Sequence, residues 1–243
     1  MKHKICAIFM LVCCLFYVAS VETIAMSTGF NTIAPTQEEK DLALSNINIS
    51  PINADTRKKT IACFDVNKKD LIAIGRKSFN KGQICVYSSS GAFLYGYEFY
   101  ETGDFAIEWD EDNINVYSVR GDCVFSVDAS GRIVDYRTGA DTKSNVKYYQ
   151  QLRSMTSKVV GETEYMLQND IGFLDFFTVE NSQIVAKYSN GDTFMIYDAG
   201  STMLFYSICK MILLVALVSI VVIVVLSRCF KISKSKHKKG TSI

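Results

Sequence analysis

An uncharged apolar run near the C-terminal end limits what this chain of 243 residues can fold into. Residues 211–227 are Met, Ile, Leu, Val, Ala and Ser, with no charge among them. As a helix rising about 1.5 Å per residue, this run measures roughly 25 Å. Extended back to Met203, with the aliphatic stem of Lys210 reaching toward the headgroups, it spans the hydrocarbon thickness of a bilayer. The sequence therefore predicts a transmembrane helix over 203–227, and a lipid bilayer as its surroundings.

The N-terminal residues have the layout of a secretory signal. Lys2 and Lys4 form a short basic region, residues 5–19 are apolar, and Ser20 precedes the first acidic residue, Glu22. We expect residues 1–20 to be a signal peptide cleaved after Ser20. The alternative is an N-terminal membrane helix that is not cleaved.

The distribution of charge predicts the topology. Basic residues lie before the first apolar run and in the tail at 228–243, and such residues favour the cytoplasmic side. We expect a single-pass protein of the cell membrane, with most of the chain outside and the C-terminus in the cytoplasm. Between Glu22 and Asp198 there are 25 acidic and 17 basic residues, a net charge of minus eight. An acidic domain argues against nucleic acid as a partner, because phosphate binding requires positive charge.

Between the two apolar segments, residues 21–59 are polar and predict a linker with one short helix. Thr36 and Glu39 have capping-box spacing, which places the helix near 37–44. Three of the cysteines lie between this linker and the expected transmembrane helix: Cys63, Cys85 and Cys123. Each stands among strand-forming residues and no Cys-x-x-Cys spacing occurs, which favours three buried thiols over one disulfide and one free thiol.

Residues 60–202 predict an extracytoplasmic all-β domain. Apolar and polar residues alternate in short runs separated by turn residues, a pattern typical of antiparallel strands. The Asn190-Gly191 pair predicts a type I′ hairpin turn. Residues 138–160 interrupt the pattern and fit a short inserted helix that includes Tyr148. The expected strands are 61–66, 71–75, 83–87, 92–99, 105–109, 114–119, 123–127, 132–136, 164–167, 173–179, 183–188 and 193–197.

A repeat of about forty residues organises these strands. The segment Val-Tyr-Ser-Ser-Ser-Gly at 86–91 recurs as Ser-Val-Asp-Ala-Ser-Gly at 126–131, with a looser third copy at 196–200. Residues 103–136 resemble one blade of a β-propeller of the NHL or quinoprotein type. This resemblance implies antiparallel blade-like meander repeats. Three units are fewer than the four to eight of typical propellers. The alternatives are an incomplete or small propeller, a further blade hidden in 22–59, an open or sandwich-like stack, and a ring completed by another chain.

Few residues suggest catalysis. His3 and His237 are the only histidines, and both lie in the terminal tails, so the domain has no His for a nucleophile pair or a metal site. We expect no cofactor and no metal. Glu108 and Asp110 stand two apart on one strand, about 7 Å from each other. With Asp128, they are the candidates for carboxylate chemistry such as glycoside hydrolysis.

The aromatic residues of one strand are the candidate binding surface. Phe93, Tyr95, Tyr97 and Phe99 alternate along the strand and are expected to share a face. Two interpretations remain open: packing in the core, or, together with Trp109, an exposed surface for a ligand. We therefore expect a non-catalytic binding module at the cell surface, with a protein or polymer partner. The alternatives are an accessory or structural subunit of a membrane complex and, with less support, a glycoside hydrolase.

Overall fold

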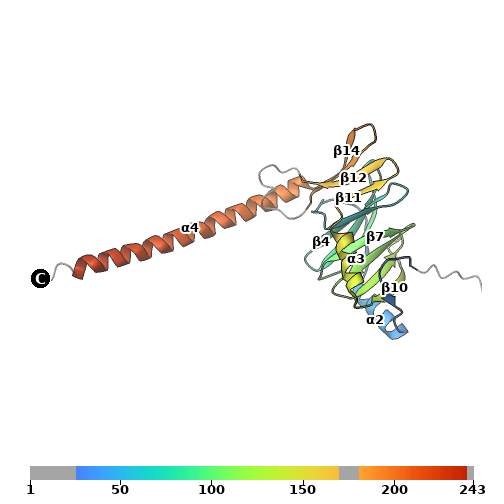
Figure 1. The fold of residues 1–243 in the computed structure, drawn as a ribbon, viewed down its shortest axis with the longest axis horizontal. Helices are drawn as coiled ribbons and strands as arrows, with labels where there is room; N and C mark the ends of the chain where they lie inside the picture. The colour runs from blue at the N-terminus through green and yellow to red at the C-terminus, as the bar shows by residue number, and fades with distance from the viewer. Residues whose placement is uncertain (1–25, 170–180, 240–243) are drawn as a thin grey trace, which may run out of the picture.

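The structure, a computed structural model, describes residues 26–169 and 181–239, with side chains to Val224. Its β domain contains three antiparallel sheets, and one long helix extends from it (Figure 1). The expected signal at 1–20 and the expected strand at 173–179 lie outside the described residues. The first sheet has the order β2-β6-β5-β4-β3, the second β1-β10-β9-β8-β7 and the third β11-β12-β13-β14.

The elements follow the predicted alternation closely. The helices are α2 (Gln37–Ile47), α3 (Lys143–Arg153) and α4 (Gly200–Lys239). The strands of the first sheet are β2 (Ser50–Ile52), β3 (Cys63–Val66), β4 (Ile72–Ser78), β5 (Lys81–Tyr87) and β6 (Phe93–Tyr100). Those of the second are β1 (Thr32–Ile33), β7 (Phe105–Asp110), β8 (Asn113–Ser118), β9 (Cys123–Val127) and β10 (Ile133–Gly139). Those of the third are β11 (Ser157–Val160), β12 (Thr163–Gln168), β13 (Gln183–Lys187) and β14 (Thr193–Asp198).

Each sheet contains a meander of four consecutive strands, so three blade-like units are present, as the repeat predicts. In the part of the chain that the structure describes, these units form no closed propeller. Their innermost strands meet, because β3 lies against β7 and β11 lies against β3. The third and fourth strands of each meander are joined by a turn that ends in a glycine with positive φ: Gly91, Gly131 and Gly191.

The repeat and the turn type need correction in the third unit. Residues 196–200 are not a third copy of the hairpin, because β14 ends at Asp198 and Gly200 begins α4. The equivalent turn contains Gly191, whose N–H donates to the Tyr188 carbonyl at 2.9 Å. Asn190 does not have a positive φ, so the hairpin is not of type I′. It has the arrangement of a type I turn followed by a glycine bulge.

The polar segment before the domain is more than a linker. Its short helix is present with the predicted capping box at Thr36 and Glu39. In addition, β1 pairs with β10 and β2 pairs with β6, so this segment extends the outer edges of the second and first sheets. Ile47 of α2 is 9% exposed and packs in the core. The segment from Thr32 to Ile52 is therefore part of the folded domain.

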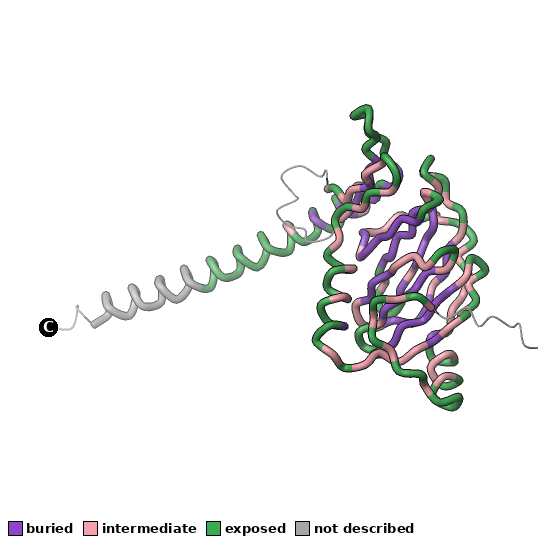
Figure 2. The backbone as a smooth tube through the Cα atoms, turned by 45° about the vertical axis from the view of Figure 1, so that its right-hand side comes forward, coloured by how far each residue is buried: buried purple, intermediate pink, exposed green. Residues whose placement is uncertain are grey.

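Two apolar cores hold the three sheets together. Figure 2 shows that the buried residues are concentrated along the strands. One face of the first sheet packs on the second sheet, and the opposite face packs on the third. Burial on both faces explains why Ile72, Ala73 and Ile74 follow one another in the sequence without alternation. The outer face of the second sheet is covered by α3 and by the chain around Met26 and Phe30. The inserted helix is therefore confirmed, and it serves as a layer of the fold.

The long helix α4 begins one residue after the last strand. Its part from Gly200 to Val224 is long and apolar enough to cross a membrane, and most of its side chains are exposed. At about 1.5 Å per residue, these 25 residues measure about 38 Å. Figure 1 shows α4 extending away from the domain as a rod from the end where β14 lies.

Candidate functional site

Two of the aromatic residues predicted to form a binding surface lie in the core. Tyr97 and Phe99 are each 1% exposed and pack between the first and second sheets. The Phe99 ring makes edge contacts with Phe105 and Phe125, at centroid distances of 5.3 and 5.5 Å. Tyr95 is half-buried against the same core. The exposed-surface interpretation is therefore wrong for Tyr97 and Phe99, and core packing explains them.

A bulge in the pairing of β5 with β6 separates Phe93 from the other aromatic residues. Val86 pairs with Tyr95, but the next residue, Tyr87, pairs with Phe93, so Leu94 is the extra residue. Because one extra residue reverses the faces of a strand, Phe93 packs toward the third sheet, against Tyr87. The expectation that the four aromatic residues share one face is wrong for Phe93.

Trp109 does line a cavity, at the point where the inner strands of the three sheets come together. The cavity has a volume of about 610 Å³ and is bordered by residues from β3, β7 and β11 and their loops. One buried carboxylate organises it. Asp65 of β3, which is 1% exposed, accepts the backbone N–H of Trp109 at 2.7 Å and forms an ion pair with Lys158 of β11. The indole N–H also donates to the Asp65 carbonyl, at 3.3 Å.

Sequence reasoning did not identify Asp65 as a site residue. The available signal was an acidic residue within an apolar strand, Cys-Phe-Asp-Val, because a buried carboxylate requires a partner. Its partners lie 44 and 93 residues further along the chain, so alternation within β3 gives no indication of them. Asp65 therefore joins all three sheets and fixes the position of Trp109.

The lining of the Trp109 cavity combines apolar surface with charges of both signs. Trp109 and Val159 provide apolar contact, while Lys68 and Lys158 provide cations and Glu111 provides an anion. Aromatic and apolar lining with a few charged groups is typical of sites that bind a ligand by shape and polar contacts. Val159 is 65% exposed at the rim, so part of this apolar surface is accessible from solvent.

The candidate catalytic carboxylates are engaged in structural contacts. Glu108 accepts hydrogen bonds from the hydroxyls of Tyr148 at 2.7 Å and Tyr117 at 2.6 Å. Asp110 accepts the backbone N–H of Ser27 at 2.8 Å. Both side chains alternate with Trp109 along β7 and therefore point to the opposite face of the sheet. The carboxylate pair and the Trp109 cavity are thus on different sides of the second sheet.

Asp128 is also held in a local structure. It lies in the turn between β9 and β10, where its carboxylate accepts hydrogen bonds from Ser130 and Arg132. Burial raises the pKa of this carboxyl, but these hydrogen bonds outweigh burial and lower the pKa below its ordinary value. Asp128 therefore stabilises its own turn as a carboxylate.

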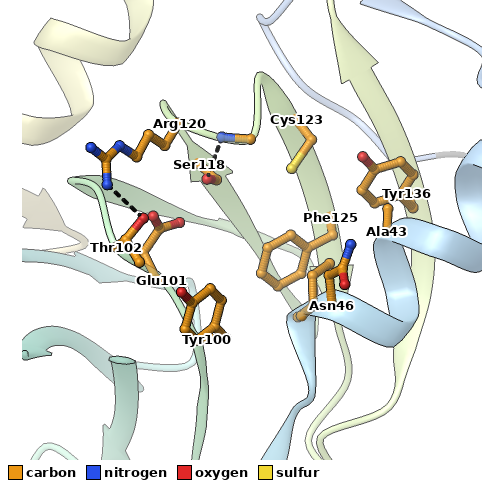
Figure 3. A pocket seen from close by; sticks show the side chains of 12 residues that line it. Ala43, Asn46, Tyr100, Glu101, Thr102, Ser118, Arg120, Cys123, Phe125 and Tyr136 are labelled. Carbon is orange, nitrogen blue, oxygen red and sulfur yellow. Dashed lines mark hydrogen bonds between the residues drawn. The ribbon is translucent and has the colours of Figure 1, made fainter. Parts of the chain in front are cut away.

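A second cavity, of about 320 Å³, lies beside α2, between the loop after β6 and the turn after β8 (Figure 3). Arg120 donates to the Thr102 hydroxyl at 2.9 Å at its rim. Glu101 lies at the same rim, is 5% exposed, and accepts the Gly103 N–H at 2.7 Å. Burial raises the pKa of the Cys123 thiol to about 11, so this cysteine remains protonated and is a poor nucleophile.

Within residues 26–169 and 181–239, no group of three His, Cys, Asp or Glu side chains is placed to hold a metal ion. Cys63, Cys85 and Cys123 are free and buried, which confirms the prediction of three thiols. No model of a known protein family matches the chain, and no curated protein has a similar sequence. The resemblance to NHL and quinoprotein blades thus stays a prediction.

Proposed function

We propose that the chain is a non-catalytic binding module, held at a cell surface by α4 and recognising a protein or polymer partner through the Trp109 cavity. The observation that carries this proposal is the fixed position of Trp109. Asp65 holds its backbone and its indole, and also pairs with Lys158 of β11, which lines the same cavity. An aromatic side chain fixed before binding loses little conformational freedom when a ligand packs on it.

The membrane topology is part of the same proposal. An apolar helix with exposed side chains supports an anchor in the bilayer. The basic tail supports a cytoplasmic C-terminus, and with it a domain and cavity on the outer side. The structural contacts of Glu108, Asp110 and Asp128 support a binding role over carboxylate catalysis.

Site-specific photo-crosslinking tests this proposal on the full chain in membranes of its source cells. A photoreactive amino acid at Val159 reports on the cavity rim, where the native side chain is 65% exposed. The same amino acid at Leu42, which is 64% exposed on α2, is the matched control. We expect one dominant adduct at Val159, absent at Leu42 and lost when Trp109→Ala is added.

Equal crosslinking at both positions, or an adduct at Val159 that persists with Trp109→Ala, would contradict the role of the cavity. Catalysis is tested separately with Glu108→Gln. A saturable hydrolase activity that is lost with this substitution would show that the chain is an enzyme.

A further inference from the structure

A third cavity, of about 390 Å³, lies between the first turns of α4 and the hairpin that joins β4 to β5. Three lysines line it, Lys59, Lys77 and Lys210, and hydroxyl groups such as those of Thr60 and Ser207 lie among them. None of the described residues that border this cavity carries a carboxylate. Ammonium and hydroxyl donors are groups that bind phosphate.

The cavity lies where α4 leaves the domain. Met203 and Ser207 of α4 are 2% and 1% exposed against the domain, and the Thr202 hydroxyl donates to the Lys58 carbonyl at 3.0 Å. Lys210, in the third turn, immediately precedes the uncharged run that begins at Met211. The three lysines therefore lie at the end of the apolar span that is closest to the domain.

Positive charge is concentrated here although the domain as a whole is acidic. Arg57, Lys58 and Lys59 are consecutive in the sequence. Lys77 forms an ion pair with Asp104 at 2.6 Å, but the same carboxylate also pairs with Arg153, so this group of three side chains is positive overall.

The Lys59 ammonium donates to the Gln83 amide oxygen at 3.1 Å, a neutral partner that fixes its position without cancelling its charge. Two of the three cations are therefore positioned before any ligand binds.

Two aromatic side chains line this cavity, Phe79 and Tyr206, and Phe205 contacts Tyr206. Phe79, at the tip of the hairpin, is 96% exposed and has a φ of 30°, a left-handed conformation that bulky residues rarely adopt. Phe205 and Tyr206 of α4 are 65% and 58% exposed. Aromatic residues next to a transmembrane segment commonly lie at the level of the lipid headgroups. Because Met203 and Ser207 pack on the domain, the first turns of α4 lie outside the bilayer, and the expected start of the span at Met203 is too early. A bilayer around the uncharged run from Met211 would bring these side chains to its surface.

We propose that this cavity binds the phosphate of an anionic phospholipid headgroup, in the leaflet that faces the domain, and that Phe79 inserts beside it. This inference rests on the proposed membrane anchor. The lysines would neutralise the headgroup, and Phe79 would contact the apolar region beneath it. The lipid would thus fill the angle between α4 and the first sheet and fix the domain against the bilayer.

Native mass spectrometry of the full chain in detergent tests the site with phosphatidylglycerol and phosphatidylcholine as probes. We expect tighter binding of phosphatidylglycerol, weakened about fivefold by Lys210→Gln, since each surface lysine contributes about that factor. Lys147→Gln on α3, also exposed, is the matched control and should leave binding unchanged. The fluorescence of Trp109 should be the same in all variants, which would show that each one is folded.

Two further arms separate the possible failures. If the full chain does not float with phosphatidylcholine vesicles after an alkaline wash, the anchor itself is refuted, and with it both proposals. If it floats but binds both lipids equally, or if Lys147→Gln weakens binding as much as Lys210→Gln, only the headgroup site is refuted. If inorganic phosphate by itself displaced phosphatidylglycerol, the cavity would be a site for free phosphate, and the lipid assignment would be overturned.

Discussion

Removing the carboxylate of Asp55 should destabilise the domain more than any loss of a surface ion pair. Asp55 and Arg76 form an ion pair at 2.7 Å, and their side chains are 4% and 2% exposed. The Tyr87 hydroxyl donates to the second carboxylate oxygen of Asp55, while the guanidinium donates to the Tyr197 hydroxyl at 3.2 Å. This cluster connects the chain before β3, the first sheet and the third sheet. Asp55→Ala would leave the Arg76 charge buried without its counterion.

The expected cost of Asp55→Ala is about 3 to 5 kcal/mol in the free energy of unfolding, the usual penalty for a buried charge left unpaired. For a domain of this size, this corresponds to a fall in Tm of roughly 6 to 20 °C. The measurement is thermal unfolding of the full chain in detergent, followed by the fluorescence of Trp109. As Trp109 is the only tryptophan in the sequence, the signal reports on one known position.

Two further variants make this test specific. Asp55→Ala combined with Arg76→Met should recover most of the lost stability, because the unpaired charge is then removed as well. Asp112→Ala, whose pair with Lys69 has both side chains more than 60% exposed, should cost less than about 1 kcal/mol. A similarly small cost for Asp55→Ala, or no recovery in the double variant, would show that the cluster does not hold the sheets together.

Three further predictions concern the buried thiols, Gly75 and the partly exposed Asp104. Burial raises the pKa of the Cys63 and Cys85 thiols to about 12, so a maleimide in mildly alkaline buffer should label them only after denaturation; peptide mapping would reveal any labelling of the native protein. Gly75→Ala should destabilise by about 1 to 3 kcal/mol, because its Cβ would meet the Cys63 sulfur and approach the Phe105 ring to 2.9 Å; an unchanged Tm would contradict this packing. Burial raises the pKa of the Asp104 carboxyl, but Lys77 and Arg153 outweigh burial and lower it. Because this pKa is lower in the folded than in the unfolded state, the carboxylate stabilises the fold at pH values above its ordinary pKa. This stabilisation is lost as the pH falls through the folded-state pKa. Asp104→Asn should therefore show a smaller fall in Tm on acidification than the parent chain.

The sequence predicted the parts of this fold that depend on short-range patterns. Apart from 173–179, which lies outside the described residues, each expected strand coincides with a strand of the structure. Alternation, glycine in turns and a capping box all act within a few residues, so they can be read from one chain. The strands β1 and β2 were missed because they have only two and three residues, too few for a periodic pattern. The strand β11 was missed because it lies within 138–160, where the alternation is interrupted.

The candidate site around Trp109 depends on contacts between distant parts of the chain, which the alternation of apolar and polar residues does not reveal. The bulge at Leu94 reversed the face of Phe93, and no turn residue marks its position. The partners of Asp65 and Asp55 come from other sheets or distant strands, so only the folded chain brings them together. Trp109 was named with the aromatic strand as part of a possible ligand surface, whereas the cavity around it depends on how three sheets meet.

The junction between β14 and α4 determines how the domain can move. Only Ala199, which is 1% exposed, separates the strand from the helix, and the Asp198 carboxylate accepts the Gly200 N–H at 2.7 Å. Because this junction contains no flexible linker, a rotation of the helix is passed on to the domain. If α4 spans a bilayer as proposed, a change in its tilt, such as one imposed by a thicker or thinner bilayer, would rotate the whole domain and alter the height of the Trp109 cavity above the surface. The distance that this cavity reaches toward the proposed partner would then depend on the thickness of the bilayer.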